Sequence, residues 1–397
     1  MKTLMILGAS ILQLPAIEQA TAMGLKVVAL DMNPAAVGFQ VPGVISEVIS
    51  TIDIPAAVAA ARRHQIDGVM TLATDMPMRT VAAIAEALHL VGVSSDTAQK
   101  ATDKSLMRDC LSEFQVPIPK YFKVRTLDEY LAAVESFRTP FVVKPADSSG
   151  SRGIYLVKEI SDAGERRKAY DYTKPFSHTG MVVVEEYMTG PEVSVETLAW
   201  QGEVAVIQIT DKITTGAPHF VEMGHTQPTR LPADTAEAIR RVAIAANHAL
   251  GIANGPSHTE IIVTSEGPKI VELGARLGGD CITTHLVPLS TGVNMVENCI
   301  RIALGEAPDM RPRFSRGAAI RYFRQHAGIV RSIIGVEAAR RLPGVRQVSV
   351  VHGVGETVTE ITDSASRMGF VIAQGEDAVE AASFCEQARD AIRVDIA

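Results

Sequence analysis

The stretch that decides the fold begins with Ser257-His-Thr-Glu260 and, after an apolar run and a Ser-Glu-Gly-Pro turn, reaches Val271-Glu-Leu-Gly-Ala-Arg276. Apolar and polar residues alternate on both sides of the turn. This pattern predicts two adjacent antiparallel strands joined by a short hairpin. Because directly opposed residues of paired strands share one face of a sheet, Glu260 and Glu272 are expected to lie side by side.

Two neighbouring carboxylates repel each other strongly when they are buried. The expected repulsion indicates that a cation lies between Glu260 and Glu272. Oxygen ligands in this number suit Mg²⁺, which proteins usually hold with one or two carboxylates together with substrate phosphates. The alternative that the residues leave open is a hairpin carrying two solvated acids.

Length and composition limit the class of protein. With 397 residues and 47% hydrophobic content, the chain can bury a large core, and two or three domains are expected. The net charge of −7 argues against a nucleic-acid-binding scaffold, which would present a basic face. The cysteines lack CxxC spacing and a nearby histidine cluster, which predicts buried thiols in a reducing compartment without zinc or disulfides: Cys110, Cys281, Cys299 and Cys385.

The N-terminal region is predicted to alternate strands and helices. Its first apolar run is interrupted from Gly8 onward and leads into an amphipathic helix, which indicates a β-strand and not an export signal. No apolar run reaches membrane-spanning length, so a cytoplasmic protein without a membrane partner is expected. The Gly8-Ala-Ser10 turn lacks GxGxxG spacing, which favours a structural or substrate-lining first domain. A parallel sheet covered by helices is indicated by strands at 4–7, 27–30 and 68–72 and helices to about 23, at 54–64 and at 78–88.

A buried strand that ends at Lys144 is followed by a loop of small residues. Glycine and serine in such a loop offer backbone N–H groups and hydroxyls to phosphate oxygens, and the lysine adds a positive charge. The loop residues expected to contact phosphate are Ser148, Ser149, Gly150 and Ser151. The alternative is a flexible hairpin turn beside a lysine that reaches to solvent.

The next apolar strand ends in the segment Glu185-Glu-Tyr-Met188, and Glu192 follows it. Backbone groups of such a segment can bind the edge of a purine, and Tyr187 or Met188 can cover its ring. Glu192 is placed to accept hydrogen bonds from ribose hydroxyls. The alternative is a charged crossover between domains.

A further strand at 204–210 leads to Lys212, whose charge can stabilise a phosphoryl group during transfer. The segment after it contains His225, which fits a substrate contact and a structural loop residue equally well. Towards the C-terminus, strands at 317–323, 346–352 and 369–373 and a helix at 376–392 are predicted to close the catalytic part.

Taken in order, these residues resemble the ATP-grasp superfamily, in particular its carboxylate–amine ligases, which include L-amino-acid ligases and relatives of glycinamide-ribotide synthetase. The resemblance covers nearly the whole chain, up to the run Ser366-Arg-Met-Gly-Phe-Val-Ile-Ala-Gln-Gly375. It implies an α/β N-terminal parallel-sheet domain followed by a two-lobed α+β ATP-grasp domain. The implied division is a Rossmann-like domain at 1–98, the smaller lobe at 99–187, and the larger lobe with a C-terminal closing segment at 188–397.

The resemblance also implies a role for each matching position. The residues implied to hold ATP are Lys104, Lys144, Ser148, Ser149, Gly150, Ser151, Glu185, Glu186, Met188 and Glu192. Adenine would be received largely through backbone groups of the hinge, the segment at 185–188. Glu260 and Glu272 would bind Mg²⁺, or Mn²⁺ in its place. Arg276 would stabilise an acyl phosphate, and Gly278 and Gly279 would let a substrate approach the backbone.

One position departs from the family pattern. Gly274 stands where many members carry asparagine, which leaves open whether one or two metal ions bind. The implied function is an ADP-forming ligase that joins a small-molecule carboxylate to an amine through an acyl phosphate. Resemblance alone suggests a homodimer. Two alternatives stay open: carboxylation or carbamoylation with bicarbonate, and a nucleotide-binding module without turnover.

Overall fold

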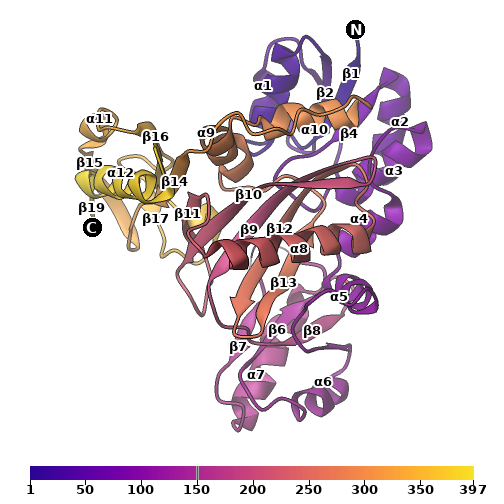
Figure 1. Ribbon diagram of the computed structural model, residues 1–397, viewed down its shortest axis with the longest axis vertical. Coiled ribbons are helices and arrows are strands. Elements are labelled where there is room, and N and C mark those ends of the chain that lie inside the picture. The colour runs from indigo at the N-terminus through magenta and orange to yellow at the C-terminus, as the bar shows by residue number, and fades with distance from the viewer. Residues whose placement is uncertain (149, 151) are drawn as a thin grey trace.

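A computed structural model of the chain describes residues 1–148, 150 and 152–397 (Figure 1). The N-terminal region forms the expected parallel sheet, with strand order β3-β2-β1-β4. Its strands are β1 (Thr3–Leu7), β2 (Lys26–Asp31), β3 (Ile45–Val48) and β4 (Gly68–Met70), and its helices are α1 (Leu14–Ala22), α2 (Ile54–His64) and α3 (Met78–Leu88). Strand β3 was not predicted, because it is a short edge strand whose residues are all partly or fully exposed.

A second, antiparallel sheet has the strand order β5-β8-β6-β7. Its strands are β5 (Tyr121–Val124), β6 (Phe141–Pro145), β7 (Tyr155–Val157) and β8 (Val182–Glu186). The helices α4 (Ser95–Ala101) and α5 (Lys104–Glu113) precede this sheet, and α6 (Leu127–Val134) and α7 (Ala163–Thr173) pack on it. Residues of this sheet and of its helices form a separate small core, in which Tyr130 of α6 and Phe141 of β6 are fully buried.

The central antiparallel sheet has the order β13-β12-β9-β10-β11-β14-β18-β16. Its first strands are β9 (Glu192–Trp200), β10 (Glu203–Thr214), β11 (Glu222–Gln227), β12 (Gly255–Thr264) and β13 (Gly267–Gly274). Helix α8 (Ala233–Leu250) crosses this sheet, and η3 (Ile282–Leu286), α9 (Val287–Thr291) and α10 (Met295–Ala303) follow the hairpin.

The C-terminal part extends the same central sheet. It supplies β14 (Gly317–Tyr322), β16 (Val345–Val350) and β18 (Gly369–Gly375), with α12 (Ala378–Ala391) packed on β14 and β18. A small additional sheet was not predicted; it contains β15 (Gly328–Ile334), β17 (Thr357–Val358) and β19 (Arg393–Ile396), and α11 (Val336–Ala339) follows β15. The expected fold class is therefore confirmed: a parallel-sheet α/β region followed by antiparallel α+β regions.

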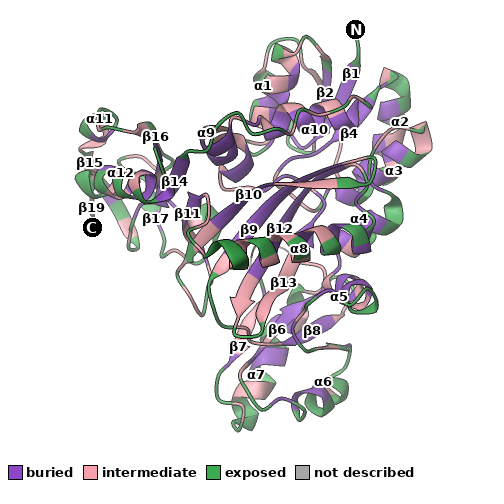
Figure 2. Cartoon of the chain, viewed as in Figure 1, coloured by how far each residue is buried: buried purple, intermediate pink, exposed green. Residues whose placement is uncertain are grey.

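The parallel-sheet region and the central sheet share one hydrophobic core. Met5 and Val28 of the parallel sheet belong to the same buried cluster as Val193 and Ile261 of the central sheet. Figure 2 shows the resulting band of buried strands, with exposed residues on the outer faces of the helices. The predicted boundary at residue 98 falls inside α4, and the division into three domains stays a prediction. No helix among residues 1–148, 150 and 152–397 is long and apolar enough to cross a bilayer.

Candidate active site

The two acids of the hairpin lie directly opposite each other. Glu260 of β12 pairs with Glu272 of β13, and a register shift follows between Glu260 and Ile261. Both side chains stay partly accessible, with 18% and 29% of their surface exposed. The predicted pairing of the two carboxylates is thus confirmed, and their position as a metal site stays a prediction.

Cations of the protein itself lie beside both acids. The ammonium of Lys212 lies 3.1 Å from Glu260, and that of Lys104 lies 3.1 Å from Glu272. Although burial alone would raise the pKa of Glu260, Lys212 and His258 outweigh it and hold that pKa well below the ordinary value. The protein's own cations therefore keep Glu260 ionised.

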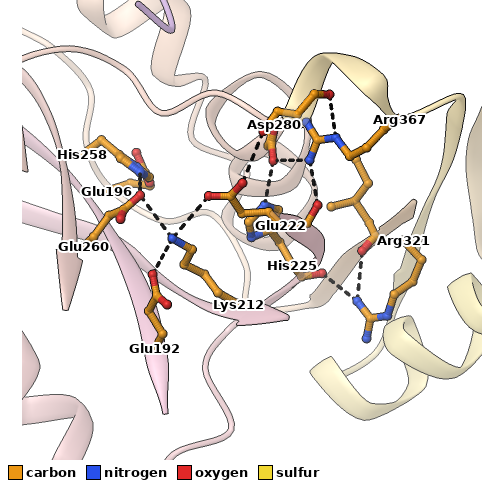
Figure 3. Close-up of polar contacts among 12 residues, drawn as sticks. Glu192, Glu196, Lys212, Glu222, His225, His258, Glu260, Asp280, Arg321 and Arg367 are labelled. Atoms are coloured by element: carbon orange, nitrogen blue, oxygen red, sulfur yellow. Dashed lines mark hydrogen bonds and ion pairs between the residues drawn. The ribbon is translucent and has the colours of Figure 1, made fainter. Parts of the chain in front are cut away.

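Lys212 lies at the centre of a cluster of carboxylates (Figure 3). Its ammonium is 2.6 Å from Glu192, 3.1 Å from Glu260 and 3.6 Å from Glu222, and its side chain is only 3% exposed. Burial opposes the charge of Lys212, but the three acids raise its pKa. Burial, together with the neighbouring acids Glu260 and Glu222, raises the pKa of Glu192. One ammonium faces three carboxylates, so this cluster has a deficit of positive charge and is suited to accept a further cation.

A buried histidine–glutamate pair lies beside this cluster and was not predicted. His258 of β12 stands opposite Glu196 of β9, and its Nδ1 is 2.5 Å from Glu196 Oε1. Burial disfavours a charged imidazole, but Glu196 outweighs burial and raises the pKa of His258 to about 9. The alternation of side chains along a strand could have indicated this pair. It puts His258 on the same face as Glu260, and Glu196 on the same face as Glu192.

The lysine expected to contact phosphate is part of a buried ion-pair network. The ammonium of Lys144 lies 2.6 Å from Glu185, and Arg108 of α5 donates to both oxygens of Glu185 at 2.7 and 3.1 Å. Burial lowers the pKa of Lys144, and the cations of Arg108 and Lys104 act in the same direction. Burial alone would raise the pKa of Glu185, but Arg108 and Lys144 lower it to about 2. The Glu185 side chain is thus committed to this network, which leaves only backbone groups for the predicted adenine contact.

The small-residue loop lies next to Lys104. The Lys104 ammonium donates to the carbonyl of Ser148 at 2.8 Å, and the Ser148 hydroxyl donates to the carbonyl of Phe176 at 2.7 Å. Gly150 has a positive φ of 69°, and no atom lies near the position of a Cβ there. The predicted phosphate contacts Ser149 and Ser151 lie outside the residues that the structure describes.

The predicted adenine segment follows β8. The N–H groups of Glu186 and Tyr187 are already donated to the carbonyls of Lys120 and Pro140, at 2.9 and 3.0 Å. Met188 is partly exposed, and its N–H has no partner within the described part of the chain. The ring of Tyr187 faces that of Phe220 at a centroid distance of 6.4 Å, and Phe220 belongs to the loop between β10 and β11.

Arg276 reaches the parallel-sheet region. Its Nε and Nη2 donate to the two carboxylate oxygens of Asp75 at 2.9 and 3.0 Å. Burial opposes this charge, but Asp75 raises the pKa of Arg276 above its ordinary range. A Cβ at Gly274 would lie 2.7 Å from Asp75 Oδ1 and about as close to Arg276 as packing allows, at 3.2 Å from its Nε. The departure at Gly274 therefore makes room for the Asp75–Arg276 pair.

The residues predicted to contact substrate lie in two places. Gly278 packs against the buried pair, since a Cβ there would meet His258 Nδ1 at 2.7 Å, and at Gly279 the nearest atom would be the Cβ of Ala73 at 3.8 Å. His225 is opposite Lys212 in the register of β10 and β11, is buried, and lies 3.2 Å from Asp280.

The partner of Asp280 comes from the C-terminal part. Arg367 donates to both oxygens of Asp280 at 2.8 and 2.6 Å (Figure 3). The guanidinium of Arg367 also lies 3.7 Å from the ring centre of Tyr322. Asp280 and Cys281 both have left-handed backbones, with φ of 50° and 60°. Through this ion pair, Arg367, which precedes β18, contacts Asp280 in the turn that follows the β12–β13 hairpin.

Comparison with known proteins finds similar families and similar chains. Residues 137–284 match the family model described as ATP-grasp domain, and residues 321–397 match L-amino acid ligase C-terminal domain 2. An uncharacterised protein of Sinorhizobium fredii is 29% identical over 81% of this chain and 67% of its own length. Alanine–anticapsin ligase of Bacillus subtilis is 29% identical over 53% of this chain, and the match spans about half of that relative, 48%. The crystal structure of L-amino acid ligase from Bacillus licheniformis is 26% identical, with a TM-score of 0.86 over 100% of this chain and 99% of that one.

Proposed function

We propose that this chain, which carries an ATP-grasp domain and an L-amino acid ligase C-terminal domain, is an ATP-dependent carboxylate–amine ligase. It forms an amide or peptide bond through an acyl phosphate and releases ADP and phosphate. The observation that carries the proposal is the direct pairing of Glu260 with Glu272 beside the acid-rich cluster around Lys212.

The paired acids fit a divalent ion. Glu260 and Glu272 offer two adjacent, partly exposed carboxylates, and the cluster beside them has more negative than positive groups. Among the described residues no group of three or more His, Cys, Asp or Glu side chains is suited to hold a metal alone. Mg²⁺ binds in this way, through one or two protein carboxylates and the phosphates of a nucleotide. When bound, Mg²⁺ or Mn²⁺ would neutralise charge on the β- and γ-phosphates.

Different residues of the candidate site bind different parts of the nucleotide. Lys104, Lys144 and the described loop residues Ser148 and Gly150 hold the phosphates, with Lys144 positioned by its ion pair to Glu185. The backbone of the segment at 185–188 receives adenine. The N–H of Met188, which has no partner in the described part of the chain, can donate to a ring nitrogen. Glu192, whose pKa is raised by burial and by the neighbouring acids Glu260 and Glu222, accepts hydrogen bonds from the ribose hydroxyls.

The reaction then follows from positioning and charge. An oxygen of the substrate carboxylate attacks the γ-phosphorus, the bond to the β-phosphate oxygen breaks, and ADP leaves. Arg276, held by Asp75, stabilises the charge that develops on the acyl phosphate, and Lys212 does so on the phosphoryl group. The amine attacks the acyl carbon, phosphate leaves with the bonding electrons, and the amine loses its proton. Water has to be kept from the acyl phosphate, which it would otherwise hydrolyse.

Two alternative functions are not favoured. Carboxylation or carbamoylation with bicarbonate uses the same nucleotide chemistry, but the C-terminal match is to an L-amino acid ligase domain. A binding module without turnover has no need of the paired acids, Lys212 and Arg276 together. Amino acids are the first carboxylates and amines to test, because both named relatives act on them or are named for them.

The test is a screen for ADP release with pairs of amino acids, small dicarboxylates and amines. A productive pair should give ADP and phosphate in equal amounts, and ¹⁸O placed in the substrate carboxylate should appear in the phosphate. Hydroxylamine in place of the amine should trap the acyl phosphate as a hydroxamate. Release of AMP, or ADP release with bicarbonate alone, would overturn the proposal.

A further inference from the structure

The Glu196–His258 pair contains a buried carboxylate oxygen that a purely structural role does not explain. Glu196 has no exposed surface, and its Oε2 has no hydrogen-bond partner in the described part of the chain. A buried carboxylate oxygen without a partner lowers stability, so proteins keep such groups mainly where a function requires them. Neither Glu196 nor His258 has a role in the binding of the nucleotide or of the acyl phosphate proposed above.

The histidine of this pair also contacts Glu260. His258 Nδ1 is bound to Glu196 at 2.5 Å, and its other nitrogen, Nε2, lies 3.5 Å from Glu260 Oε1. Lys212 reaches the same Oε1 from the other side at 3.1 Å (Figure 3). With two protein cations gathered at Oε1, Oε2 is the oxygen of Glu260 that a metal ion can take.

The pair also supports the turn after the hairpin. A Cβ at Gly278 would lie 2.7 Å from His258 Nδ1 and 2.9 Å from both Glu196 oxygens. The backbone that follows Arg276 therefore packs onto the Glu196–His258 pair. One buried pair thus contacts both the candidate metal ligand and the candidate substrate turn.

We propose that Glu196 and His258 are positioning residues that orient Glu260 for the metal–nucleotide complex. The inference rests on the proposed function, since it requires a metal ion at Glu260. Glu196 fixes which imidazole nitrogen points at Glu260, and His258 then sets the rotation of that carboxylate. Partners that orient a metal ligand in this way typically contribute 10- to 100-fold to metal affinity or activity.

The experiment measures how strongly the metal and the nucleotide assist each other's binding. The dissociation constant of ADP is measured by calorimetry in EDTA and again in saturating Mn²⁺, and their ratio is the coupling factor. Glu196→Gln and His258→Gln should each reduce this factor about 10- to 100-fold while ADP binding in EDTA changes little. Because His258→Gln leaves Glu196 unpaired and buried, the double variant Glu196→Gln/His258→Gln, which removes both charges, is measured as well.

A matched control is present in the parallel-sheet region. His64 lies 2.5 Å from Glu47 there, and both side chains are partly buried. His64→Gln and Glu47→Gln should leave the coupling factor unchanged, and thermal unfolding shows whether each variant is folded. If the folded single or double variants keep the wild-type coupling factor, the positioning role is refuted. If the wild-type protein itself shows no coupling between Mn²⁺ and ADP, the proposed metal site fails instead.

Discussion

Replacing Arg276 tests the proposed chemistry most directly. Its guanidinium donates two hydrogen bonds to Asp75 at 2.9 and 3.0 Å, and the two side chains are 12% and 19% exposed. Arg276→Ala removes the charge that we propose stabilises the acyl phosphate, which should reduce kcat on the order of 10²- to 10³-fold, or about 3–4 kcal/mol. It also leaves Asp75 without its partner, and this should lower the free energy of unfolding by about 1–3 kcal/mol.

Two further variants separate the catalytic loss from the loss of stability. Asp75→Asn/Arg276→Ala removes the unpaired charge, so the free energy of unfolding in urea should recover while kcat for ADP release stays low. Arg276→Lys should restore little activity, because a lysine cannot reproduce the paired geometry to Asp75. Near-normal ADP release by folded Arg276→Ala, or recovery of kcat in the double variant, would refute the assignment.

Three other perturbations have defined outcomes. Glu185→Gln should lower the free energy of unfolding by about 3–5 kcal/mol at neutral pH, since it breaks a fully buried ion pair with Arg108. Because the pKa of Glu185 is lowered from 4.5 to about 2, this stabilisation is present above pH 4.5 and is lost as the pH falls towards 2, so urea unfolding of wild type and variant should converge there; a pH-independent difference would contradict the assignment. Gly278→Ala should reduce turnover on the order of 10²-fold because its Cβ would displace His258, whereas Gly353→Ala, which has open space, should leave kcat at the wild-type value; equal kcat in both would refute the contact. Chelation by EDTA should abolish ADP release, and Mg²⁺ or Mn²⁺ should restore it; turnover in EDTA would argue against a metal site.

The pairing of Glu260 with Glu272 could be predicted because its causes are local. A strand repeats every two residues, and the short hairpin turn sets which residues stand opposite each other. The same reasoning placed α2 and α3 at their observed bounds, since their apolar spacing is helical. Strand β3 and the small C-terminal sheet escaped prediction because short, exposed strands carry a weak alternation signal.

The amino-acid sequence by itself determined the strand–helix alternation of the N-terminal region and the hairpin with its two acids, and it predicted the candidate nucleotide residues. Only the tertiary structure decided the partners of these residues. Asp75 meets Arg276 from 201 positions away, and Glu196 meets His258 from 62 positions away. The physical reason is that such contacts depend on sheet order and on the packing of the parallel-sheet region against the central sheet, which no local periodicity encodes.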